Sequence, residues 1–121
     1  TGLNPHCETN KSYSEEEKII LPAIKKLRKK NININGPFAA DTLFLKKNIN
    51  KFNIVIGMYH DQVLTPIKTL YGFKAINITL GLPFLRITPD HGPNNNFLGK
   101  NMSDPSSVIE IFKFLGQIRE N

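Results

Sequence analysis

The 121-residue sequence has little of several features that assign a protein to a class at once. It contains a single cysteine, Cys7, so no internal disulfide can form, which fits a reducing compartment such as the cytoplasm. Its apolar runs are far shorter than a membrane span, and its first residues lack the basic and apolar regions of a signal peptide. It also lacks an initiator methionine, and we expect it to be a piece of a longer polypeptide.

Common catalytic and cofactor motifs are absent as well. The sequence has no G-x-S-x-G, no P-loop and no G-x-G-x-x-G, so neither a serine-hydrolase elbow nor a Rossmann-type nucleotide site is indicated. Cys7 adjoins His6, but adjacency in sequence is not the geometry of a catalytic Cys–His pair. The three histidines do not have zinc-finger spacing, so a metal site would need ligands from distant segments.

The charge is unbalanced toward basic residues, with 16 Lys and Arg against 10 Asp and Glu and a pI of about 9.6. Nucleic-acid binding is one explanation of such an excess, and lysines that solvate helix faces are the other. The lysines are spread along the chain without interleaved aromatic residues, so we expect no nucleic-acid partner. A small anionic ligand such as a phosphate ester would need only a few of these charges.

The pattern of apolar residues predicts an α/β fold. The length allows one domain with a real core, and 40% of the residues are hydrophobic. Helical spacing predicts helices over 14–31, 61–70 and 105–118, and a short helix from Asp41. Strands are expected over 31–35, 52–59, 74–80 and 84–88. This alternation predicts a mixed, largely parallel sheet flanked by helices.

Local signals mark the ends of two of these helices. Ser14 is expected to cap the first helix and Asp104 the last. Pro22 lacks a backbone donor and should kink the first helix. The last helix is expected to serve core packing alone.

The apolar run over 52–59 stops abruptly at three polar residues, His60, Asp61 and Gln62. In open α/β sheets ligands bind beyond the carboxyl ends of the strands, so His60 is a candidate ligand residue. His91 follows another predicted strand and His6 follows a turn. Histidines in such places are nevertheless more often structural or merely exposed than ligands.

Three further polar residues suggest anion recognition. Lys68 lies near the end of a predicted helix, Asn77 within an apolar strand, and Arg86 between apolar neighbours. An arginine can clamp a phosphate or carboxylate with two hydrogen bonds, and a lysine can act as a point charge. An internal salt bridge or a hydrogen bond at a sheet edge explains the same residues equally well.

Five strings of the sequence together resemble a known family. They are GLNPH at 2–6, PFAADTLF at 37–44, MYHDQ at 58–62, NITLGLPF at 77–84 and DHG at 90–92. In this order they resemble the C-terminal part of the 4-hydroxythreonine-4-phosphate dehydrogenase (PdxA) family, from residue 2 to about residue 119. The resemblance implies that residues 1–121 are the C-terminal portion of such an enzyme, without its N-terminal portion. It also implies part of a two-domain fold like that of isocitrate and isopropylmalate dehydrogenases.

The resemblance implies a role for individual residues. His6 and His60 match ligands of one divalent metal ion (zinc, magnesium or cobalt), with a third histidine reaching the site from the other subunit of a homodimer. Residues that match the family's substrate-binding positions are Lys68, Asn77 and Arg86. Contact with NAD or NADP is carried onto His91 and Gly92, and the candidates for a general base are Asp41 and Asp61.

The activity implied is oxidation of 4-phosphohydroxy-L-threonine by NAD or NADP, followed by decarboxylation to 3-amino-2-oxopropyl phosphate. This reaction belongs to pyridoxal 5'-phosphate (vitamin B6) biosynthesis in the cytoplasm. The 121 residues alone are expected to be inactive, because one metal ligand and much of the substrate cleft are missing. The alternative is a stand-alone phosphate- or anion-binding module without catalysis.

Overall fold

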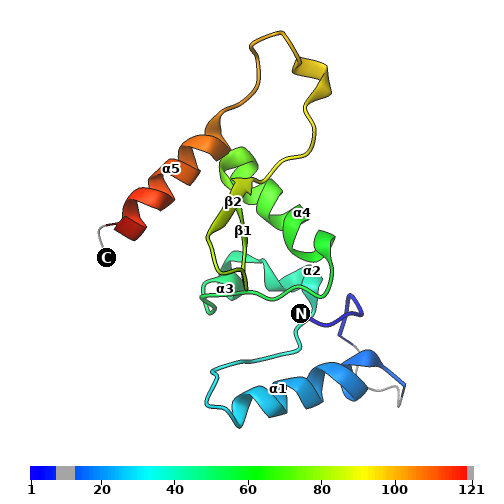
Figure 1. The fold of residues 1–121 in the computed structure, drawn as a ribbon. Helices are drawn as coiled ribbons and strands as arrows, with labels where there is room; N and C mark the ends of the chain where they lie inside the picture. Colours follow the sequence, from blue (N-terminus) through cyan, green and yellow to red (C-terminus); the bar gives the residue numbers. More distant parts are fainter. Residues whose placement is uncertain (8–12, 120–121) are drawn as a thin grey trace. The chain divides into compact units, whose positions relative to one another are not determined.

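The computed structural model describes residues 1–7 and 13–119. The chain divides into two compact units, Thr1–Pro66 and Ile67–Asn121. The colours of Figure 1 run from blue to green through the first unit and from green to red through the second. None of the helices in the described part of the chain is long and apolar enough to cross a membrane.

The first unit contains a helix with an irregular beginning. A π-helical turn, η1 (Glu16–Ile20), runs directly into α1 (Leu21–Arg28). The Ser14 hydroxyl oxygen accepts a 3.3 Å hydrogen bond from the Glu17 backbone N–H, so the predicted cap is confirmed. Pro22, in the first turn of α1, cannot donate to the preceding turn. This missing donor disturbs the regular helix, and the disturbed part is the wide π-helical turn η1.

Two short helices follow, α2 (Ala40–Leu43) and α3 (Lys46–Ile49). The short helix predicted near Asp41 is thereby confirmed. Among the described hydrophobic residues only Ile24 of α1 and Leu43 of α2 are buried, so the apolar core of these residues is small. Buried polar side chains therefore have a large share in holding the segments of the first unit together.

Two of the predicted strands are wrong. Residues 31–35 and 52–59 contain no β-strand, and Ile54 in the second segment is 80% exposed. An apolar run records a preference for burial, but a strand also needs a neighbour that pairs with its backbone. Nothing in the described part of the first unit supplies such a neighbouring strand.

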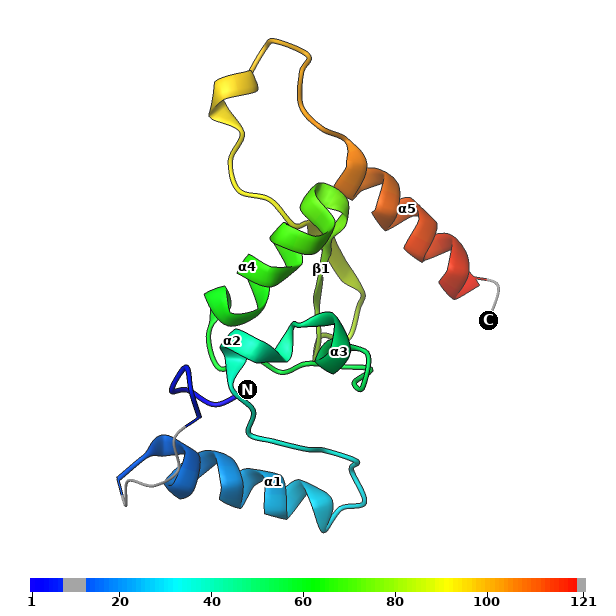
Figure 2. The ribbon, with the colours of Figure 1, turned by 180° about the vertical axis from the view of Figure 1, so that it is seen from behind.

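The predicted helix over 61–70 is confirmed as α4 (His60–Tyr71), which begins in the first unit and ends in the second. It contains Pro66 and leads into the 3₁₀ turn η2 (Gly72–Lys74). Another 3₁₀ turn, η3 (Asn95–Phe97), lies in the segment before the last helix. In Figures 1 and 2 this segment, yellow to orange, loops away between β2 and α5.

The sheet of the described residues has two strands, β1 (Ile76–Thr79) and β2 (Arg86–Pro89), which pair antiparallel. The strands predicted over 74–80 and 84–88 are thus found, but the largely parallel sheet is not. The reason lies in the connection: six residues link β1 to β2, whereas parallel neighbours need a crossover of a dozen or more. Gly81 supports the turn with a positive φ of 85°.

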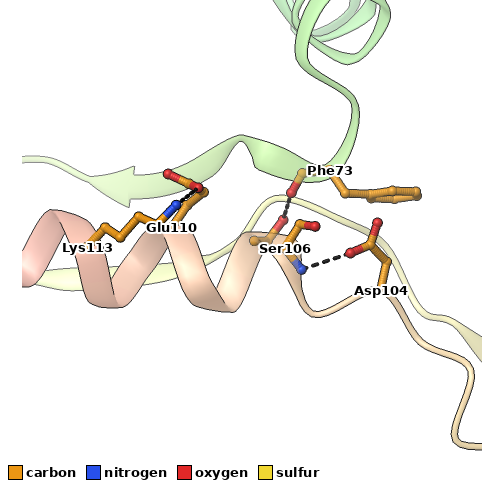
Figure 3. A network of polar contacts seen from close by, with 6 residues as sticks. Phe73, Asp104, Ser106, Glu110 and Lys113 are labelled. Atoms are coloured by element: carbon orange, nitrogen blue, oxygen red, sulfur yellow. Dashed lines mark hydrogen bonds and ion pairs between the residues drawn. The ribbon is translucent and has the colours of Figure 1, made fainter.

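The last helix, α5 (Ser106–Arg119), packs against β1, β2 and η2 of the same unit. Asp104 Oδ1 accepts a 2.8 Å hydrogen bond from the Ser106 backbone N–H, as predicted for a cap (Figure 3). Hydrogen bonding to the Ser106 side chain, followed by this backbone bond, lowers the pKa of Asp104. The buried Ser107 hydroxyl donates to the Phe73 carbonyl oxygen and thereby fixes η2 against the start of α5. Phe112 of α5 is exposed, so not every apolar side chain of this helix packs against the described residues.

Candidate functional site

The backbone around His6 is held by hydrogen bonds from its own loop and from η1. The Asn4 N–H donates to Glu16 Oε1 at 2.7 Å. Asn4 Oδ1 accepts a 3.0 Å hydrogen bond from the His6 N–H. The Asn4 carbonyl oxygen accepts another, also of 3.0 Å, from the Cys7 N–H. The loop therefore fixes the backbone of His6, while its ring stays exposed.

Each of the two predicted metal-binding histidines lies beside one of the two predicted bases. His6 Nδ1 is 3.4 Å from Asp41 Oδ2, and His60 Nδ1 is 2.8 Å from Asp61 Oδ1. A carboxylate at Nδ1 favours the tautomer in which Nε2 carries the free lone pair, as in many metal-bound histidines. The rings are 70% and 78% exposed, so these contacts orient them more than they stabilise the fold.

Both histidines belong to the first unit, but they do not make a complete metal site there. Within the described residues, no group of three or more His, Cys, Asp and Glu side chains could hold a metal ion. A metal ion at His6 or His60 would therefore need a ligand from elsewhere, as the family resemblance implies.

Two buried polar residues of the first unit were not predicted, Glu16 and Gln62. Glu16 accepts backbone hydrogen bonds, above all from Asn4, and these lower the pKa of its carboxyl group. Burial, followed by the charge of Glu16, raises the pKa of the Cys7 thiol, which disfavours the thiolate that a nucleophile requires. The sequence signal for Gln62 was its place in the MYHDQ string, whereas Glu16 had only a capping pattern.

In the second unit, Lys68 forms an ion pair that the sequence left open. Its Nζ lies 3.1 Å from Asp90 Oδ2, with side chains 32% and 17% exposed. The nitrogen itself is buried and makes no well-aligned hydrogen bond to any described residue, so we regard the contact as an ion pair. Nζ also lies 5.8 Å from the centre of the Phe73 ring.

The same aromatic ring contacts His91. The rings of Phe73 and His91 meet edge to face, with centres 6.4 Å apart. His91 Nδ1 lies 3.1 Å from the Gly92 carbonyl oxygen, which can only accept, so Nδ1 carries the hydrogen. The structure thus joins Lys68 and His91 through Asp90 and Phe73, neither of which was a predicted site residue.

The β1–β2 hairpin places Asn77 and Arg86 on one face. Asn77 pairs with Thr88 and Thr79 with Arg86, and paired residues project to the same side of an antiparallel sheet. Arg86 Nη1 donates a 2.9 Å hydrogen bond to Thr79 Oγ1. Both Asn77 and Arg86 are exposed, so this polar face can reach a ligand.

Comparison with known proteins gives a consistent result. Residues 1–115 match the family described as pyridoxal phosphate biosynthetic protein PdxA. A 4-hydroxythreonine-4-phosphate dehydrogenase of Sulfurihydrogenibium sp. is 52% identical over 110 residues, which cover 90% of this chain and 34% of the relative. One from Beijerinckia indica is 40% identical over 119 residues, covering 98% and 35%.

Solved structures agree with these matches. The structure of a 4-hydroxythreonine-4-phosphate dehydrogenase from Burkholderia phymatum has a TM-score of 0.68 at 39% identity and covers 90% of this chain and 34% of that one. The structure of a protein from Salmonella typhimurium, described as a putative 4-hydroxythreonine-4-phosphate dehydrogenase, has a TM-score of 0.69 at 38% identity and covers 91% of this chain and 34% of that one. The chain spans about a third of the length of the curated relatives it matches.

Proposed function

The chain belongs to the pyridoxal phosphate biosynthetic protein PdxA family, and on that premise we propose that it is part of a 4-hydroxythreonine-4-phosphate dehydrogenase. The observation that carries the proposal is the family match over residues 1–115, together with relatives named for this activity. The reaction is oxidation of 4-phosphohydroxy-L-threonine, followed by decarboxylation, in vitamin B6 biosynthesis. The relation to the two-domain isocitrate dehydrogenase fold stays a prediction.

The donor set of the first unit fits a divalent metal ion. His6 and His60 each meet a carboxylate at Nδ1, which leaves Nε2 as the donor atom. Imidazole nitrogen suits zinc or cobalt better than magnesium, which prefers oxygen ligands. The metal would polarise the reacting hydroxyl group as a Lewis acid.

Asp41 and Asp61 take the role of orienting the histidines in this proposal. Each carboxylate lies beside a ring nitrogen, at 3.4 Å and 2.8 Å, and this favours an orienting role over that of a general base. Each would fix the tautomer and the direction of its histidine before a metal ion binds.

The substrate would be held by residues of the second unit. Arg86 and Asn77 share the polar face of the hairpin. Lys68, whose ammonium group is buried against Asp90, would have to turn away from that carboxylate to supply a second cation. A guanidinium group can bind a phosphate through two hydrogen bonds, and an ammonium group adds charge without a fixed direction. The role of all three is to anchor the anionic and polar groups of the substrate so that its hydroxyl group reaches the metal.

The proposed oxidant is a nicotinamide cofactor. A dehydrogenase needs a hydride acceptor, and NAD or NADP supplies that chemistry. A Cβ atom added at Gly92 would meet no atom of the described residues within 4 Å, so these residues form no fitted cradle around Gly92. Contact of NAD or NADP with His91 and Gly92 stays a prediction.

The assembly proposed is a cytoplasmic homodimer in which a partner histidine completes the metal site. The rival is an anion-binding module without catalysis, which the exposed polar face of Asn77 and Arg86 also favours. The two differ in what precedes this sequence in its gene. A preceding segment that carries a histidine and matches the first two thirds of the relatives supports the enzyme.

A chimera tests the proposed activity directly. The first two thirds of the Sulfurihydrogenibium relative would be fused to this chain, because the two share 52% identity over the matched part. With NAD, 4-phosphohydroxy-L-threonine and either Co²⁺ or Zn²⁺, we expect the chimera to form NADH. The His60→Asn substitution should abolish NADH formation. The isolated chain should form none. A folded chimera that binds the substrate without forming NADH contradicts the proposal.

A further inference from the structure

We propose that Gln62 is a positioning residue that fixes the segment carrying His6 against the segment carrying His60. The inference rests on the proposed metal site and deepens it. Gln62 lies in the first unit and is 6% exposed. A buried amide has to find partners for both its donor and its acceptor, and those partners here are the two histidine segments.

The contacts of Gln62 join these segments directly. Its Nε2 donates a 2.7 Å hydrogen bond to the Gly2 carbonyl oxygen. Its Oε1 accepts from the Met58 N–H at 2.7 Å and from the Thr1 hydroxyl at 2.6 Å. One side chain therefore bonds a backbone group four residues before His6 and another two residues before His60.

The short distance along the chain makes this link effective. Between Gly2 and His6, the Asn4 N–H is fixed by Glu16 Oε1, and Asn4 Oδ1 accepts from the His6 N–H. The turn therefore leaves the His6 backbone little freedom once Gly2 is fixed. On the other side, His60 begins α4, so its backbone follows the helix that carries Gln62.

A third segment meets at the same point. The Gly2 N–H donates a 2.9 Å hydrogen bond to the Phe38 carbonyl oxygen, three residues before Asp41. Asp41 is the carboxylate beside His6. Gly2 and Gln62 thus connect the segments that carry His6, His60 and Asp41, which come from three separate parts of the sequence.

The test compares the chimera described above, which supplies the missing metal ligand, with its Gln62→Met variant, which keeps the size of the side chain and removes both hydrogen-bonding functions. Cobalt binding would be followed by the visible spectrum of Co²⁺ and by calorimetry. We expect affinity to fall about tenfold, the lower end of the loss seen when groups that orient metal ligands are removed. Ser107→Ala is the matched control, because it removes one buried hydrogen bond in the second unit, and it should leave Co²⁺ affinity unchanged.

Hydrogen exchange without metal separates this inference from the proposed function. We expect the Met58 amide to exchange faster in Gln62→Met than in the unaltered chain, because its acceptor is lost. If the unaltered chimera binds no Co²⁺, the metal proposal fails, and exchange at Met58 alone decides the link. Faster exchange with unchanged Co²⁺ affinity would overturn the positioning role, as would unchanged exchange.

A milder variant covers the case in which Gln62→Met does not fold. Gln62→Asn keeps the amide but shortens its reach, so it cannot bond Gly2 and Met58 together at their present distances. It should lose Co²⁺ affinity in the same direction, while circular dichroism shows a folded chain. Unaltered affinity in a folded Gln62→Asn chain counts against the proposal.

Discussion

Lys68 and Asp90 form an ion pair of 3.1 Å in the second unit, with the lysine nitrogen buried. Asp90→Asn keeps the shape of the side chain and leaves the ammonium group without its counter-charge. We expect a loss of about 1–2 kcal/mol in the free energy of unfolding, between the values for exposed and buried pairs. Urea denaturation, followed by spectroscopic signals from residues of the second unit, measures this change in unfolding free energy.

The control for that variant is Glu110→Gln in α5. Glu110 pairs with Lys113 at 2.8 Å on the surface of the helix (Figure 3). Removing this charge should cost less than about 0.5 kcal/mol, as is usual for such helix pairs. Equal losses of unfolding free energy for the two variants would show that burial does not increase the contribution of the Lys68–Asp90 pair to stability.

Asp41→Asn distinguishes the two roles open to Asp41. Because Asp41 lies 3.4 Å from His6 Nδ1, we expect Co²⁺ affinity to fall about 10-fold to 100-fold, as for other carboxylates that orient metal-binding histidines. A general base would behave differently: metal affinity would hold, and only the NADH-forming rate of the chimera would fall. Calorimetry and the rate assay on the same variant decide between them.

One substitution at two glycines should have opposite effects. A Cβ atom at Gly2 would lie 3.0 Å from both Cys7 Sγ and Glu16 Oε1, and Glu16 is held by Asn4, so Gly2→Ala should destabilise by about 1–3 kcal/mol. A Cβ atom at Gly116 in α5 would meet no atom within 4 Å. Gly116→Ala should therefore stabilise by about 0.5–1 kcal/mol. Chemical denaturation of both variants is the measurement.

The stability of the first unit should depend on pH through Glu16. Its pKa is lowered from an ordinary value of 4.5, chiefly by the Asn4 hydrogen bond, so the ionised form favours the folded state. This contribution is complete above the ordinary pKa and is lost as pH falls through the lowered pKa.

The test of this pH dependence compares the chain with Glu16→Gln, which cannot ionise. The difference in unfolding free energy between them should be larger at about pH 6 than at about pH 3. The control variant Glu17→Gln, at an exposed neighbouring position, should show the same change of unfolding free energy with pH as the unaltered chain. A difference that stays constant with pH would exclude Glu16 as the source.

Much of the fold could be predicted where the determinants are local. The helix that begins at His60, the cap at Asp104 and the strand after Lys74 all follow from residues within a few positions of one another. The hairpin could have been predicted as antiparallel, because the short turn at Gly81 leaves no room for a crossover. The resemblance to the family supplied the site residues.

The remaining features depend on contacts between distant residues. Asp90 lies far along the chain from Lys68, and Gln62 meets Gly2 across sixty residues, so no local pattern reveals either contact. The wrong prediction of a strand over 52–59 also comes from contacts between distant residues. A run of apolar residues indicates that a segment is suited to burial, but it does not indicate which other segment covers it.

That failed strand has a practical consequence for the isolated chain. Residues 52–58 are uncharged and free of proline, and Ile54 and Ile56 are exposed. Such a segment can pair with the same segment of another molecule, as edge strands do in aggregation. The chain should therefore associate in a concentration-dependent way that light scattering can follow, and a lysine at position 54 should suppress it. Purification at low concentration, or together with the rest of the polypeptide, becomes the condition under which the site chemistry can be measured.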